Sequence, residues 1–64
     1  MTKTYRFKLD YNNEVEVFTE EQLMNTAHDL REFLNVDNFY IREPRTVEEA
    51  IIVLELAERT YLDR

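Results

Sequence analysis

Residues 3–11 read KTYRFKLDY, a stretch in which polar and apolar side chains alternate without a break. Alternation with a period of two places successive side chains on opposite faces of a strand, so the stretch predicts a strand with one apolar face. Asn12 and Asn13 suit a turn because asparagine tolerates left-handed backbone, and the alternation resumes at Val15 and Val17. The chain therefore opens with a predicted β-hairpin. Its apolar face carries Tyr5, Phe7, Leu9 and Tyr11.

The register of this hairpin depends on where Glu16 points. A two-residue loop would place Glu16 opposite Leu9, on the apolar face, whereas a three-residue loop places Val17 there. A slip of one residue moves every side chain of a strand to the other face of the sheet. We therefore expect the three-residue loop, with Val15 and Val17 facing the core and Phe18 facing outward.

Two capping boxes mark the starts of two helices. The first is TEEQ at residues 19–22, and the second is TVEE at residues 46–49. After the first box, apolar residues recur at helical spacing, which predicts an amphipathic helix. After the second box we expect a helix that runs to about Leu62. The stripe of the first helix consists of Leu23, Ala27, Leu30 and Leu34, with Phe33 beside it.

A short alternating run, FYIR at residues 39–42, lies between the helices and ends before Pro44. Proline disfavours helix in the residue before it, so the run predicts a third strand. The expected order is ββαβα. A right-handed crossover then gives an α+β fold, in which a three-stranded antiparallel sheet of order 2-1-3 has both helices packed on one face.

The composition limits the class of protein. The chain has 64 residues and no cysteine, so we expect a single domain over residues 1–64 whose small core is not supplemented by disulfides or thiolate metal sites. The absence of glycine from the sequence argues against phosphate-binding loops and dinucleotide fingerprints, which need positive φ and close backbone approach. We expect no cofactor.

Catalytic residues are not recognisable either. His28 is the single histidine, on the polar face of the first helix, and the sequence has no serine or cysteine for it to activate. Adjacent acids such as Glu48 and Glu49 point about 100° apart on a helix and are explained by the helix start. We expect a protein that is not an enzyme, with no catalytic, cofactor-binding or metal-binding residues.

Membrane insertion is not expected. The longest apolar run, residues 50–54, is far shorter than the roughly 20 residues that span a bilayer. Charges at Lys3, Arg6 and Lys8 interrupt any signal-peptide core, so we expect cytoplasmic residence. The net charge of −6 disfavours binding to anionic membrane or directly to nucleic acid.

The second helix carries an unusual pair. Ile52 and Leu56 point away from its apolar stripe and are one turn apart, which makes a small apolar ridge with a charged rim. Two interpretations remain open: the ridge is an interface with a partner or a second copy, or it touches another part of the same chain. The acids that we expect to contact a partner with it are Glu48, Glu55, Glu21, Glu32 and Asp29.

The leading functional hypothesis is a small acidic, non-catalytic module that binds a protein partner through the helical layer, with Ile52 and Leu56 as its anchor. One form of it is an inhibitor or regulator that occupies the basic groove of a nucleic-acid-handling protein. A second hypothesis is a single-stranded nucleic-acid-binding sheet face. A third is a structural subunit of a homodimer or larger homo-oligomer that associates through Ile52 and Leu56. The sheet-face hypothesis uses Arg6, Lys8, Phe18, Tyr40 and Arg42.

Overall fold

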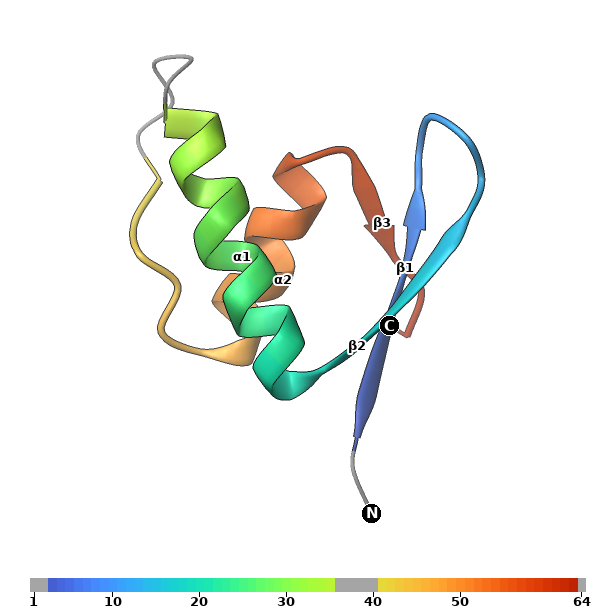
Figure 1. Cartoon of the computed structure of the whole chain (residues 1–64), viewed down its shortest axis with the longest axis horizontal. Helices are drawn as coiled ribbons and strands as arrows, with labels where there is room; N and C mark the ends of the chain where they lie inside the picture. The colour runs from blue at the N-terminus through green and yellow to red at the C-terminus, as the bar shows by residue number, and fades with distance from the viewer. Residues whose placement is uncertain (1–2, 36–40, 64) are drawn as a thin grey trace.

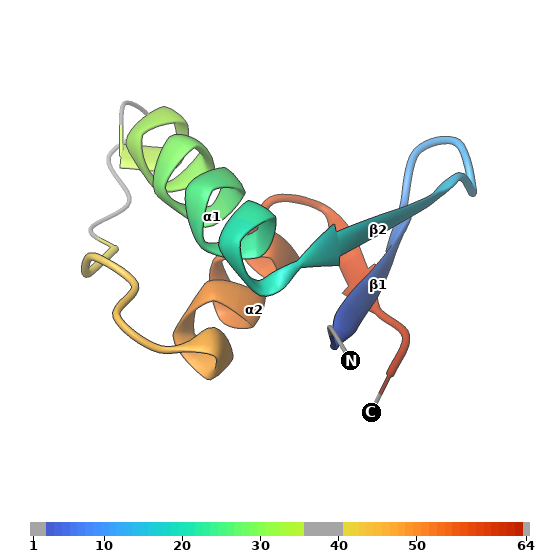
Figure 2. The same cartoon turned by 60° about the horizontal axis from the view of Figure 1, so that its bottom comes forward.

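The computed structural model describes residues 3–35 and 41–63 and has an α+β fold. Its elements are β1 (Thr4–Leu9), β2 (Val15–Thr19), α1 (Glu20–Asn35), α2 (Val47–Leu56) and β3 (Arg59–Tyr61). The strands form one antiparallel sheet of order β2-β1-β3, with both helices packed on one side of it (Figures 1 and 2). The expected class and sheet order are therefore confirmed.

The predicted element order is wrong, because the third strand follows α2 instead of preceding it. Ile41 and Arg42 of the predicted strand lie outside any strand, and residues 39 and 40 lie outside the described residues. The backbone of Ile41 instead bonds to α1: its N–H donates to Asn35 Oδ1 at 3.0 Å, and its carbonyl accepts from Arg31 Nε at 2.8 Å. Residues 41–46 are thus irregular, and their first residue is bonded to α1.

α2 ends at Leu56, not near Leu62, because the chain turns into a strand. The N–H of Ala57 donates back to the carbonyls of Val53 and Leu54, and Glu58 takes a left-handed conformation with φ of 63°. Left-handed residues after a helix are usually glycine. The sequence has no glycine, so it carried no visible stop signal for this helix.

The predicted hairpin register is also wrong. Lys8 pairs with Val15 and Tyr5 with Phe18, with a connection over residues 10–13 in which Asn13 has φ of 60°. Phe18 therefore faces the helices and is buried, whereas Val15 and Val17 are more than half exposed. They lie on the face of the sheet that points away from the helices, which we call the open face. Burying a phenylalanine removes more apolar surface from water than burying a valine, which favours the observed register.

The first capping box forms as predicted, and Thr46 caps α2 as expected, with one of the two bonds of a capping box. The N–H of Gln22 donates to Thr19 Oγ1 at 3.2 Å, and Gln22 Oε1 accepts from the N–H of Thr19 at 3.0 Å. In α2 the N–H of Glu49 donates to Thr46 Oγ1 at 3.2 Å. These bonds satisfy amide groups that have no partner within the helix, and so they fix where each helix starts.

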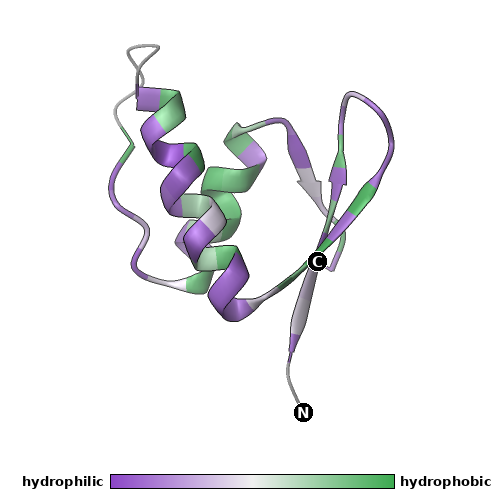
Figure 3. Cartoon of the chain, viewed as in Figure 1, coloured by the Kyte–Doolittle hydropathy of each residue, from purple (hydrophilic) through white to green (hydrophobic). Residues whose placement is uncertain are grey.

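The core lies between the sheet and the helices. Figure 3 shows α1 striped and α2 apolar over most of its surface, consistent with the central position of α2. Phe7 lies at the middle of the core, with its ring 5.8 Å from that of Phe18 and 5.0 Å from that of Tyr61. The buried cluster is Tyr5, Phe7, Phe18, Leu23, Ala27, Ala50, Ile51, Val53 and Leu54.

Candidate interaction surface

A groove of about 660 Å³ opens where three elements end. Phe33, Tyr11 and Leu56 have the highest exposed fractions among the large hydrophobic residues described, at 70%, 69% and 56%, and all three line it. Scattered exposed hydrophobics are ordinary on a protein surface, but three that converge on one hollow are not. We call this hollow the apical groove. Its lining is Tyr11, Leu30, Phe33, Leu34, Leu56, Ala57, Glu58 and Arg59.

Each wall of the apical groove is positioned by a local feature of the chain. Phe33 lies in the last part of α1, and Leu56 is the final residue of α2. Tyr11 lies in the hairpin connection, where the N–H of Asn13 bonds to the carbonyl of Leu9. Figure 1 shows the end of α1, the hairpin connection and the turn after α2 at the same end of the molecule.

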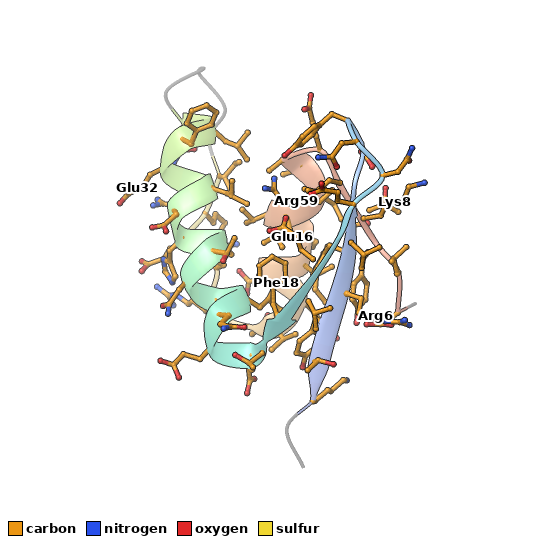
Figure 4. The ribbon with its side chains drawn as sticks, turned by 45° about the vertical axis from the view of Figure 1, so that its right-hand side comes forward. Arg6, Lys8, Glu16, Phe18, Glu32 and Arg59 are labelled. Atoms are coloured by element: carbon orange, nitrogen blue, oxygen red, sulfur yellow. The ribbon has the colours of Figure 1, made fainter. Side chains whose placement is uncertain are left out.

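Arg59, one of the lining residues of the groove, forms an ion pair with Glu16. Arg59 Nε donates to Glu16 Oε1 at 3.2 Å, and its Nη1 donates to the carbonyl of Ala57 at 2.8 Å. Figure 4 shows the two side chains meeting between the sheet and the helices. Because Arg59 is neutralised by Glu16, the remaining charge in the groove lining is that of Glu58, which is exposed.

The predicted ridge of Ile52 and Leu56 is exposed, at 53% and 56%. It lines a second hollow of about 300 Å³ together with Ile41, Arg42, Glu49 and Val53. Leu56 belongs to both hollows, so the ridge and the apical groove share one side chain. The structure thus connects the predicted anchor to a larger apolar surface than the sequence indicated.

The predicted acids are spread over two helices. Glu48 lines a shallow hollow of about 320 Å³ with Ile51, Ile52 and Tyr61. Glu21, Asp29 and Glu32 are exposed on α1, and Glu55 is partly exposed on α2. None of these four acids lines the hollows described here, so the structure joins Ile52 and Leu56 to Glu48 but does not gather the whole predicted set.

The predicted nucleic-acid face does not assemble as expected. Phe18 is buried against the helices, Arg42 lies in the connection before α2, and residue 40 lies outside the described residues. Arg6 and Lys8 remain on the open face, and Arg6 is occupied. Its backbone N–H, Nε and Nη2 all donate to the carboxylate of Asp63, at 2.7 to 2.9 Å.

The Arg6–Asp63 pair also changes the titration of both groups. The hydrogen bonds and charge of Arg6 lower the pKa of Asp63, and those of Asp63 raise the pKa of Arg6. The pair joins β1 to the residues that follow β3, which are 57 positions apart. The pair therefore holds β1 against the residues that follow β3, at the surface of the protein.

His28, the single histidine, has a structural partner. His28 Nδ1 lies 3.8 Å from Glu43 Oε1, which links α1 to the connection before α2. Over residues 3–35 and 41–63, no three histidine or acidic side chains come together in a way that could hold a metal ion. In the same part of the chain, no helix is both long and apolar enough to cross a bilayer.

Of the groove residues, the sequence selects Leu56 alone as a partner-binding residue, so its two most exposed members, Tyr11 and Phe33, are missed. The sequence places Tyr11 on the apolar face of the first strand and Phe33 beside the apolar stripe of α1. The position of Phe33, about 60° around the helix from Leu30, was the available signal. Comparison with protein-family models, with curated proteins and with solved structures finds no match in any of the three.

Proposed function

We propose that this chain is a small acidic interaction module without catalytic activity, and that it binds a protein partner through the apical groove and the adjoining ridge. The observation that carries the proposal is the convergence of Tyr11, Phe33 and Leu56 on one hollow. Tyrosine and other aromatic residues are enriched at interfaces because they bury a large area at a small cost in conformational entropy.

The size of the surface fits a partner segment. Fully burying one large apolar side chain contributes about 1.5 to 3 kcal/mol, and these side chains are already partly buried. Three such residues therefore supply roughly 3 to 6 kcal/mol, before the cost of association is subtracted. Tight binding requires additional contacts, which Ile52 and the surrounding charges can supply.

Charge complementarity defines the chemistry of the partner. The chain carries a net charge of −6, and Glu58 is the exposed charge in the groove lining. A partner segment with apolar side chains flanked by lysine or arginine would bury its apolar groups in the groove and place its charges against the acidic surface. Such binding weakens as salt is added, because exposed charges are screened.

One specific form of this function is an inhibitor or regulator of a nucleic-acid-handling protein. In that form the exposed carboxylates of Glu21, Asp29 and Glu32 on α1 and of Glu48 on α2, with the partly exposed Glu55, take the place of phosphates in a basic groove of the target. In that case the module and a nucleic acid would compete for the same basic groove of the target.

The experiment is affinity capture from the native cell extract followed by mass spectrometry, with three baits. These are the unaltered chain, a Phe33→Ser and Leu56→Ser double variant, and a Val15→Ser variant. Val15 is 52% exposed and lies on the opposite side of the sheet, so it is the matched control. A basic partner retained by the first and third baits but lost from the second supports the proposal.

Two further readings complete the experiment. Far-UV circular dichroism must show that the double variant folds like the unaltered chain. Partners that bind all three baits equally, or that bind with no dependence on salt, contradict the proposal. Displacement of the partner's nucleic acid by the module separates the inhibitor form from other forms of regulation.

A further inference from the structure

β2 is an edge strand with little of the usual protection of sheet edges. Proteins protect such edges with proline, charged side chains, bulges, very short strands or a covering element, and the one charge of β2, Glu16, is bonded to Arg59 of the same chain. β2 is five residues long, VEVFT, and contains neither proline nor a basic residue. Its open-face side chains, Val15 and Val17, are 52% and 55% exposed. The other edge, β3, has three residues, and the Arg6–Asp63 pair joins β1 to the residues that follow it.

The direction of the backbone groups of β2 follows from its pairing with β1. The N–H of Leu9 donates to the carbonyl of Glu14, and the carbonyl of Arg6 accepts from the N–H of Leu62 on the side of β3. The residues of β1 thus bond alternately to β2 and to β3, so Glu16 and Phe18, which lie opposite Phe7 and Tyr5, bond to β1. The N–H and C=O groups of Val15 and Val17 consequently face away from β1, toward the open edge.

We propose that two copies of this chain pair through β2, antiparallel about a two-fold axis at Val17, and form a continuous six-stranded sheet. In this register Val17 lies opposite Val17 of the second copy and exchanges two backbone hydrogen bonds with it. Glu16 lies opposite Phe18, and Val15 lies opposite Thr19. All helices then lie on one side of the joined sheet, because they lie on one side of each separate sheet.

The charge of β2 selects this register and a second copy as the occupant. An axis at Glu16 would place two Glu16 carboxylates directly opposite each other, which is destabilising. An axis at Phe18 leaves Val15 and Glu16 without partners in the strand. The register centred on Val17 places each of the five strand residues opposite a strand residue, with no like charges of the strand opposite each other. Its backbone bonds are those of the two Val17 residues, because the N–H of Thr19 already donates to Gln22 Oε1. β2 is thus complementary to itself.

This pairing does not use the apical groove and does not depend on the function proposed above. An interface of two five-residue strands is small, so the dimer belongs to the class of weak interfaces and its population depends on protein concentration. Association therefore has to be followed over a concentration series.

Cysteine cross-linking tests the register directly, because the sequence has no cysteine. Across the axis the two Val17 Cα atoms are expected about 5.5 Å apart, within the range that a disulfide bridges. The two Val15 residues are separated by about four residues of strand, or roughly 13 Å, which is out of reach. Under mild oxidation we expect Val17→Cys to form a covalent dimer many times faster than Val15→Cys.

Analytical ultracentrifugation of the cysteine-free chain supplies the second measurement. We expect a monomer–dimer equilibrium that Val17→Lys abolishes, because it places two like charges across the axis. The matched control is Thr4→Lys, which adds the same charge on the open face of the central strand. Both variants should keep the circular dichroism spectrum of the unaltered chain.

Three results would overturn the proposal. One is equal cross-linking of the Val15→Cys and Val17→Cys variants, which indicates random collision. A second is a monomer at every concentration up to about 1 mM, the weak limit of association. A dimer that survives Val17→Lys, with cross-linking absent at position 17, places the interface elsewhere and refutes the β2 pairing.

Discussion

Replacing Phe18 should destabilise the protein severely, whereas replacing its neighbour Val17 should have little effect. Phe18 is 8% exposed and packs edge-to-face on Phe7, with ring centroids 5.8 Å apart and an interplanar angle of 69°. Val17 is 55% exposed on the other face of the sheet. The hairpin register that the sequence suggested would reverse the two effects, so this pair of variants tests the register.

The expected loss for Phe18→Ala follows from the buried area. A phenylalanine buries at least about 150 Å², which at roughly 25 cal/mol per Å² corresponds to about 4 kcal/mol. Truncation of buried phenylalanines generally costs about 3 to 5 kcal/mol. A domain of 64 residues has a free energy of unfolding of roughly 3 to 10 kcal/mol, so the loss is a large part of the total.

The assay is urea denaturation in dilute solution, followed by circular dichroism and by the fluorescence of the tyrosines. Phe18→Leu, which should cost about 1 to 2 kcal/mol, keeps the test measurable if Phe18→Ala does not fold. Val17→Thr retains the branched shape and should change the free energy of unfolding by less than about 0.5 kcal/mol. A larger loss for Val17→Thr than for Phe18→Leu would refute the observed register.

Two more predictions concern the turn after α2 and the Arg6–Asp63 ion pair. Glu58→Gly should raise the free energy of unfolding by up to about 1 kcal/mol, because a left-handed residue other than glycine is strained; a lower urea midpoint would contradict this. Asp63→Asn should lower stability at neutral pH. Because Arg6 depresses the pKa of Asp63 in the folded chain, this contribution is complete above the ordinary carboxyl pKa and disappears as the pH falls through the folded-state value. The difference in urea midpoint between the two proteins should therefore shrink below about pH 4, and a constant difference would disprove the link.

The sequence alone predicts correctly those parts of the fold whose signals lie within a few neighbouring residues. The alternation of residues 3–11 and the two capping boxes identified β1 and the starts of both helices. These signals depend on neighbouring residues only, and so one sequence is enough to find them. The exposure of Ile52 and Leu56 on α2 likewise follows from helical geometry.

The hairpin register and the position of β3 could not be predicted, because both involve the contact between Glu16 and Arg59, which are far apart in the sequence. The sequence alone shows no partner for a carboxylate on the inner face, and so it favours the register that places Glu16 on the outer face. The partner is Arg59, 43 positions away in a strand that reads as the end of a helix. The wrong register and the missed β3 have one cause. Because the sequence shows no end of α2 before Arg59, Arg59 is not recognised as a strand residue that could lie beside Glu16.

The apical groove could not be predicted for a similar reason. Tyr11 and Phe33 come from the hairpin connection and the end of α1, and their proximity depends on the register and on where α2 ends. Leu56 was found because its exposure is a property of one helix. A site assembled from the ends of three elements requires the tertiary arrangement to be known.

The central position of β1 has a consequence for synthesis on the ribosome. β1 is the earliest strand of the sheet to be made; β2 follows it after a short connection, but the partner of its other edge, β3, comes last. Arg6 and Asp63 are 57 positions apart, which is about 3 to 11 s of translation. During that interval the nascent chain exposes an unpaired edge of its own central strand, alongside apolar surface that later becomes core. Until β3 pairs with it, this edge of β1 is open to pairing with another chain.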